Sequence, residues 1–168
     1  MQRLTLIGMP GSGKSAVGKI IAKRLGWSFV DTDHVIEKNF GTKLQAVVDR
    51  LGTEGFRVVE EETVLKLDVE EQTVISTGGS VVYSDAAMRH LSSISTVVFL
   101  NLPIEALRGH IALGAPRGIV GMGEGGLEQL HEQRFPLYKK HAHIVVLMDS
   151  DTPEEAATRI LSQLQRQL

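Results

Sequence analysis

The strongest constraint on the fold of this chain is a glycine-rich run near its start. Residues 8–15 read Gly-Met-Pro-Gly-Ser-Gly-Lys-Ser and fill every position of the pattern G-x-x-x-x-G-K-S/T. An apolar stretch at 4–7 precedes the run, and apolar residues at 17, 20, 21 and 25 follow it at helical spacing. A phosphate-binding loop requires this order of strand, loop and helix. The pattern therefore predicts a site for a nucleoside triphosphate.

The residue types in this run suit the chemistry of a triphosphate. Glycines let backbone N–H groups approach a phosphate closely at a helix N-terminus, where they supply partial positive charge. Lys14 can then reach the terminal phosphates, and the Ser15 hydroxyl can bind Mg²⁺. The alternative interpretation is a glycine-rich turn with a solvated lysine. We assign the nucleotide contacts to Gly8, Met9, Pro10, Gly11, Ser12, Gly13, Lys14, Ser15 and Ala16.

Strand-like and helix-like stretches alternate along the rest of the chain. The expected strands are the apolar segments 4–7, 27–31, 73–77, 96–101 and 144–148. The expected helices after the loop helix are 32–40, 44–51, 56–67, 84–91, one opened by Pro103, 127–140 with a bend or break at Pro136, and one from 152 onward. Five apolar strands separated by helices indicate a parallel sheet covered on both faces. We therefore predict an α/β protein with a three-layer α/β/α architecture around a five-stranded parallel sheet.

Composition narrows the class of protein further. A length of 168 residues fits one domain, residues 1–168. The net charge of −2 gives no bulk electrostatic case for binding nucleic acid or an anionic membrane. The chain has no cysteine, no apolar run long enough to span a membrane, and no apparent room for a signal peptide before the first strand. We expect a soluble, cytoplasmic protein that acts on a small molecule, and we expect a monomer.

Two carboxylates follow the second expected strand. Asp31 and Asp33 flank Thr32, and the carboxyl ends of parallel strands share an edge with the phosphate loop. One carboxylate at such a place can bind Mg²⁺, and the other can accept a proton from an attacking hydroxyl. The alternative is that Asp33 only caps the following helix.

Together with the loop, four further motifs produce a specific resemblance. These are Asp-Thr-Asp at 31–33, G-x-x-G-F-R-x-x-E at 52–60, Thr-Gly-Gly at 77–79 and Arg-Phe-Pro-Leu-Tyr at 134–138. In this order and spacing the chain resembles the shikimate kinase family over nearly its whole length. The resemblance implies a P-loop fold of the nucleoside-monophosphate-kinase type, with substrate-binding helices at about 32–67 and a mobile lid at about 112–126. It also implies ATP and Mg²⁺ as cofactors, and transfer of the γ-phosphoryl group to the 3-hydroxyl of shikimate.

The resemblance also assigns roles near the phosphate. It makes Asp33 the residue that holds the acceptor hydroxyls and acts as base. It makes Asp31 the Mg²⁺ partner beside Ser15. Lys14 and Arg117, the latter in the lid, are the expected catalytic cations, because positive charge stabilises the transferring phosphoryl group. For Arg117 the alternative is an exposed loop charge.

The acceptor residues follow from the same resemblance. Arg57, with Glu60 as its orienting neighbour one helical turn on, and Arg134 are expected to clamp the acceptor carboxylate, because guanidinium groups bind carboxylates through paired donors. Gly78 and Gly79 are expected to let the backbone approach the acceptor ring. The alternatives are surface ion pairs of Arg57 with Glu60 or Glu61, and of Arg134 with Glu128 or Glu132.

The chain departs from the family pattern at three places. Ser80 stands where a third glycine is usual, so its hydroxyl could narrow the pocket or bind a different acceptor. Arg117 is followed by Gly118 rather than proline, and the adenine region carries His110 in place of an arginine. These departures leave two alternatives open: a kinase of another sugar acid such as gluconate, and a nucleotide-binding regulatory module with weak transfer.

Overall fold

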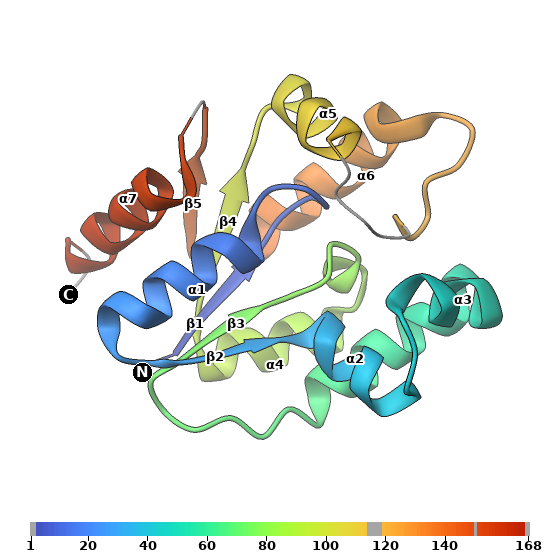
Figure 1. Ribbon diagram of the computed structural model, residues 1–168, viewed down its shortest axis with the longest axis horizontal. Coiled ribbons are helices and arrows are strands. Elements are labelled where there is room, and N and C mark those ends of the chain that lie inside the picture. The colour runs from blue at the N-terminus through green and yellow to red at the C-terminus, as the bar shows by residue number, and fades with distance from the viewer. Residues whose placement is uncertain (1–2, 114–118, 150, 167–168) are drawn as a thin grey trace.

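The computed structural model describes residues 3–113, 119–149 and 151–166. Its strands are β1 (Arg3–Ile7), β2 (Ser28–Asp31), β3 (Thr73–Ser76), β4 (Thr96–Asn101) and β5 (Ile144–Leu147). Its helices are α1 (Lys14–Leu25), α2 (Thr32–Phe40), α3 (Leu44–Leu65), α4 (Asp85–Ile94), α5 (Ile104–Ala112), α6 (Gly126–His141) and α7 (Pro153–Gln165), with a short 3-10 helix, η1, at Val81–Tyr83. Figure 1 shows these elements in place.

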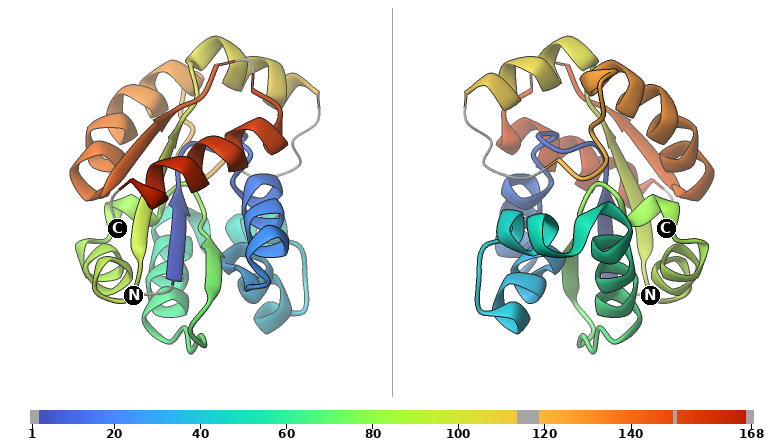
Figure 2. Two further views of the ribbon diagram at one scale, coloured as in Figure 1. Left: turned by 90° about the vertical axis from the view of Figure 1, so that its left-hand side faces the viewer. Right: turned by 90° about the vertical axis from the view of Figure 1, so that its right-hand side faces the viewer.

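The strands form one five-stranded parallel sheet in the order β2-β3-β1-β4-β5. Helices α1 and α7 pack together on one face, and α4 and α6 lie on the other, so the sheet is seen between α1 and α4 in Figure 2. The predicted three-layer α/β/α architecture is confirmed. Strand β1 lies between β3 and β4, which places the loop after β1 at the point where the order of connection reverses.

Two separate clusters of apolar side chains hold the fold together. The larger one fills both faces of the sheet, as expected for central parallel strands. The smaller one lies between α2, α3 and the segment before α6, and consists of Ile36, Leu44, Val47, Phe56 and Val120. Burial of its members, all below 9% exposed, fixes α2 and α3 as a unit next to the carboxyl end of β2.

Three local features differ from the sequence-based expectation. The segments 44–51 and 56–67 belong to one helical span, α3, which has a single non-helical residue, Gly52, at φ 70° and ψ 177°. Gly55 lies within the helix, so only one of the two glycines breaks the pattern. Helix α6 continues through Pro136, which therefore does not end it. Met148, predicted in the last strand, follows it.

No helix in the described ranges is long and apolar enough to cross a membrane.

Candidate functional site

The loop after β1 wraps around the start of α1. Gly13 caps the helix with φ at 84°, a left-handed conformation that glycine adopts without a steric penalty. Lys14 is 8% exposed, and its Nζ donates to the carbonyl oxygens of Gly8 and Met9, at 2.9 Å each. The Met9 side chain is part of the apolar core, so this residue can serve the nucleotide only through its backbone. The ammonium group is thus folded back over the loop, where a phosphate would meet it.

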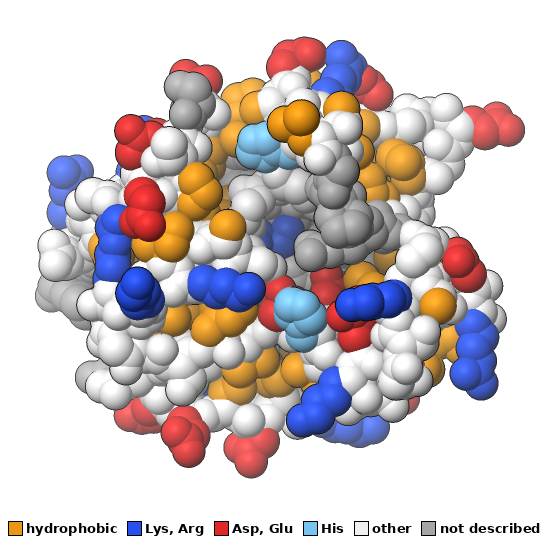
Figure 3. All heavy atoms as spheres, viewed as in Figure 1, with side chains coloured by type: hydrophobic (Ala, Val, Ile, Leu, Met, Phe, Trp, Pro, Cys, Tyr) orange, Lys and Arg blue, Asp and Glu red, His pale blue; other side chains and the backbone are white. Residues whose placement is uncertain are grey.

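A cavity of about 380 Å³ opens beside this loop. Figure 3 shows the face of the molecule on which this cavity opens, with a basic side chain deep inside it and acidic side chains at its lower rim. The wall includes residues from the loop, α2, α3, the glycine pair after β3, α5 and α6. The sequence-predicted residues in it are Pro10, Gly11, Gly13, Lys14, Ser15, Ala16, Asp33, Gly78, Gly79 and Arg134. The fold therefore brings the predicted phosphate loop, base and one guanidinium group to one cavity.

Ser15 lines the cavity and contacts Asp31, which lines a neighbouring pocket that also includes Asp33. The Ser15 hydroxyl donates to Asp31 Oδ2 at 2.5 Å and lies 3.3 Å from the Ser76 hydroxyl. The other Asp31 oxygen accepts the backbone N–H of Asp33 and caps α2, so the cap that sequence reasoning allowed for Asp33 belongs to Asp31. Hydroxyl and carboxylate oxygens are the donors that Mg²⁺ prefers.

This pair fits a magnesium ion that is bound mainly through phosphate and water. Within the described residues, no group of three or more His, Asp or Glu side chains could enclose a metal ion. Mg²⁺ typically uses one or two protein oxygens and completes its shell with phosphate and water oxygens. Ser15 and Asp31 offer such a minimal donor set beside the phosphate loop.

The glycine pair after β3 makes room for charged side chains. A methyl group on Gly78 would collide with Glu60 Oε1 and lie 2.9 Å from Asp33 Oδ1. A methyl group on Gly79 would lie 2.9 Å from Pro10 Cδ and 3.0 Å from Arg134 Nη1. A side chain at either position would displace these neighbours, and the two carboxylates converge at Gly78.

Arg134 is buried inside α6, at 1% exposure. One guanidinium nitrogen donates to the Val120 carbonyl, and Nε has no hydrogen-bond partner among the described residues. The alternative that pairs Arg134 with Glu128 at the surface is wrong, because Arg134 is buried and Glu128 pairs with Arg108. A buried cation with an unsatisfied donor at a cavity wall suits an anionic ligand.

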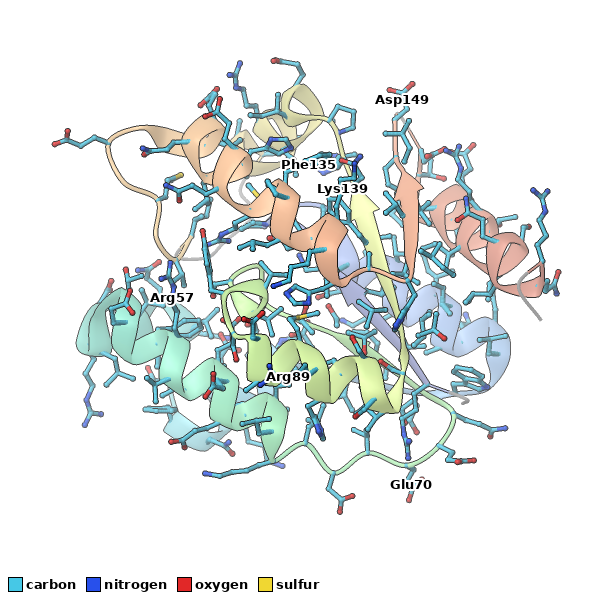
Figure 4. The ribbon with its side chains drawn as sticks, turned by 180° about the vertical axis from the view of Figure 1, so that it is seen from behind. Arg57, Glu70, Arg89, Phe135, Lys139 and Asp149 are labelled. Atoms are coloured by element: carbon cyan, nitrogen blue, oxygen red, sulfur yellow. The ribbon has the colours of Figure 1, made fainter. Side chains whose placement is uncertain are left out.

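Arg57 lies on the other side of the same region. Its guanidinium group stacks on the Tyr83 ring at 4.0 Å from the centroid, and that of Arg134 lies 5.3 Å from the same ring. Arg57 lines a smaller, adjoining pocket of about 230 Å³ rather than the main cavity. Figure 4 shows it between α3 and the segment before α6, and its Nη2 would lie 3.4 Å from a methyl group on Gly121. The two predicted clamps are neighbours, but only Arg134 faces the main cavity.

The predicted partner of Arg57 is wrong. Its Nη1 forms an ion pair with Glu54 at 3.1 Å, one turn before it on α3, and not with Glu60 one turn after it. Glu60 is 1% exposed and accepts the Ser80 hydroxyl at 2.5 Å. The pKa of Glu60 is raised from 4.5 to about 7, mainly because the carboxyl group is buried. The hydrogen bond from Ser80 has the opposite effect and lowers this pKa. The Asp33 charge raises it further, and the two arginines lower it.

Sequence reasoning gave no role to Tyr83 or Tyr138, and it noted His110 only as a departure from the family pattern in the adenine region. Tyr83 provides the ring under both guanidinium groups, and Tyr138 donates to the Gly79 carbonyl at 2.6 Å. The His110 ring hydrogen-bonds the Gly11 carbonyl through Nδ1 at 2.8 Å and lines the cavity above the loop. Tyr138 closes the Arg-Phe-Pro-Leu-Tyr motif, four residues after Arg134, so its helical register was an available signal. The predicted lid residue Arg117 lies outside the described residues.

Comparison with known proteins agrees with this geometry. The family model described as Shikimate kinase matches residues 10–165. A shikimate kinase of Paracidovorax citrulli is 42% identical over 146 residues, which cover 84% of this chain and 79% of the relative. A shikimate kinase of Thermodesulfovibrio yellowstonii is 35% identical over 170 residues, covering 99% of this chain and 96% of the relative.

A solved structure has nearly the same fold. The shikimate kinase of Acinetobacter baumannii, in complex with shikimate, superposes with a TM-score of 0.91 at 27% identity, over 99% of this chain and 94% of that one. This chain belongs to the shikimate kinase family, and it is a phosphotransferase that acts on a hydroxyl group.

Proposed function

We propose that this protein transfers the γ-phosphoryl group of ATP to the 3-hydroxyl of shikimate. The observation that carries the proposal is one cavity lined by Lys14, Asp33 and the buried guanidinium group of Arg134. A cation for the phosphates of the donor nucleotide, a base and an anion-binding group thus line the same cavity. This is the set that a kinase of a hydroxylated carboxylic acid requires.

In this proposal Arg134 binds the acceptor carboxylate through its paired donors. Its Nε is buried without a partner in the described part of the chain, and an incoming carboxylate would satisfy it. Arg57 supports the same charge from across Tyr83. Gly78 and Gly79 keep the cavity floor free of side chains where the acceptor ring would lie. Asp33 accepts the proton of the attacking hydroxyl at its carboxylate.

The nucleotide side uses the loop after β1. Backbone N–H groups of the loop, which Pro10 alone lacks, bind the phosphates, and Lys14 exchanges its carbonyl partners for phosphate oxygens. Ser15 and Asp31 would hold Mg²⁺, which would neutralise charge on the triphosphate. Segment 112–126 acts as the lid that excludes water, with Arg117 as its cation.

The assay that tests this proposal couples ADP release from ATP, Mg²⁺ and shikimate to a spectroscopic signal. Turnover that depends on shikimate is expected. A folded protein without turnover at millimolar shikimate would refute the acceptor assignment. Gluconate should be tested as an acceptor in the same assay. The Ser80 hydroxyl donates to Glu60 within the cavity wall, so this serine gives no reason to prefer another acceptor. Nucleotide binding without product from any acid would favour the regulatory alternative.

We also propose that the protein works as a cytoplasmic monomer. The cavity is built from a single chain, and the described residues that line it come from one domain. A second subunit is therefore not needed to complete the site. Size-exclusion chromatography with light scattering tests this, and activity that rises with self-association would contradict it.

A further inference from the structure

Glu60 is held in an unusual way for a carboxylate beside two arginines. It is 1% exposed, and its Oε2 accepts the hydroxyl of Ser80 at 2.5 Å. Ser80 is itself 3% exposed and follows the glycine pair after β3. A buried hydroxyl–carboxylate bond of this kind fixes the carboxyl plane, because neither group can exchange it for water.

The second oxygen of Glu60 points elsewhere. Oε1 is buried and has no hydrogen-bond partner among the described residues. It approaches Gly78 so closely that a methyl group there would collide with it, and Asp33 Oδ1 converges on the same point. Glu60, Asp33 and Gly78 all line the main cavity. The unsatisfied oxygen therefore lies at the wall of the acceptor cavity, next to the proposed base.

Arg57 does not hold Glu60 in this position. Its ion pair goes to Glu54, and its guanidinium plane rests on Tyr83. Glu60 and Ser80 line both the main cavity and the adjoining pocket that contains Arg57, so the pair forms a shared wall between the two. The orientation of Glu60 is thus set by Ser80, from a different element of the fold.

We propose that Ser80 is a positioning residue of the acceptor site: its hydroxyl holds Glu60 so that Oε1 faces the acceptor beside Asp33 and takes part in binding it. This inference rests on the proposed function. It assigns Ser80 a task that the usual glycine could not perform, since glycine has no hydroxyl. It also assigns Glu60 to the acceptor rather than to Arg57.

The charge of Glu60 provides the readout. The charged or titratable groups that act on it are Asp33, Arg57 and Arg134, and it acts in turn on Tyr138. Because the pKa of Glu60 is about 7, its carboxyl group gains a proton as the pH falls through neutrality. A neutral Glu60 leaves more net positive charge for an anionic acceptor, so binding weakens as pH rises through about 7. Because the Ser80 hydrogen bond stabilises the ionised form, its loss must raise this midpoint.

The experiment measures the dissociation constant of shikimate by calorimetry between pH 5.5 and 10. The wild-type protein should show a step near pH 7. Ser80→Ala should move the midpoint upward by about one to two pH units, the size expected for one hydrogen bond to a charged group. Ser80→Thr, which keeps the hydroxyl, should bring the midpoint back toward the wild-type value. Glu60→Gln should remove the step.

Ser84→Ala is the matched control. Ser84 donates to Glu61 at 2.5 Å, one position along α3 from Glu60, but neither residue lines the main cavity. The control should lower stability, since Ser84 caps α4, and leave the midpoint in place. An unshifted midpoint in Ser80→Ala would overturn the proposal. The proposal would also be overturned if the pH step of the wild type persisted in Glu60→Gln. This second variant keeps the test valid if the Ser80 variants are unstable. A wild-type protein that binds no shikimate at any pH would instead overturn the proposed function.

Discussion

The sharpest test of the acceptor site is to replace Arg134. The residue is 1% exposed, so solvent does not screen its charge, and its guanidinium group reaches Val120, Gly79 and the cavity at once. Arg134→Met keeps the length and apolar stem but removes every donor. Arg134→Lys keeps the charge but loses the fork that binds both oxygens of a carboxylate.

The magnitude follows from the number of donors lost. A hydrogen bond to a charged group contributes about 1.5–3 kcal/mol, and a bidentate contact supplies two of them. Arg134→Met should therefore lower kcat/KM for shikimate by about 3–5 kcal/mol, which is about 10²- to 10⁴-fold. Arg134→Lys should lose about half of that free energy, or about ten- to hundredfold. The loss should appear as a higher acceptor KM, while the dissociation constant of ATP stays unchanged.

Steady-state kinetics with shikimate as the varied substrate measures this effect. The control is Lys139→Met, on the same helix, where an exposed cation lies over the Phe135 ring. Figure 4 shows Lys139 and Phe135 together on α6. The control should leave the acceptor KM unchanged. If Arg134→Met alters that KM by less than threefold while its melting temperature is preserved, Arg134 does not bind the acceptor and the reasoning is refuted.

Three further substitutions test other parts of the structure. Lys14→Ala should lower kcat by about 10²- to 10³-fold with the fold retained, and wild-type turnover would contradict the role of the loop. Gly79→Ala should destabilise the protein by about 1–3 kcal/mol in urea unfolding, because the new methyl group would press on Pro10; an unchanged midpoint would contradict the close approach. The pKa of Glu60 is raised in the folded state, so between pH 4.5 and about 7 the folded protein keeps a proton that the unfolded chain has released. The free energy of unfolding therefore falls as the pH rises through that window. Glu60→Gln should therefore unfold at a higher temperature than the wild type at pH 8, and equal melting temperatures would contradict a buried titrating carboxyl.

Much of the fold could be predicted because its signals are local. The pattern at 8–15 fixes a strand before it and a helix after it, and apolar runs bounded by polar turns marked the other strands. The break at Gly52 was also predictable from residue type, whereas Gly55 has helical backbone angles and lies next to the buried Phe56. Pro136 was a weaker signal for a helix end, because proline removes one backbone hydrogen bond but α6 is also held by the buried side chains of Leu130, Arg134 and Tyr138. The helix therefore continues past Pro136.

The partners of the charged residues were less predictable, and Arg57 shows why. Glu54 and Glu60 lie three residues before and after it on α3, so helical spacing allows either ion pair. In the structure Arg57 pairs with Glu54, while Glu60 accepts the hydroxyl of Ser80, which follows β3 and is brought next to Glu60 by the fold of the sheet. Glu60 lies in the buried wall, and Arg57 contacts Glu54 and Tyr83, half-exposed, while Arg134 alone enters the main cavity. The Ser80–Glu60 contact joins residues twenty positions apart in different elements, so spacing along the sequence contains no information on it.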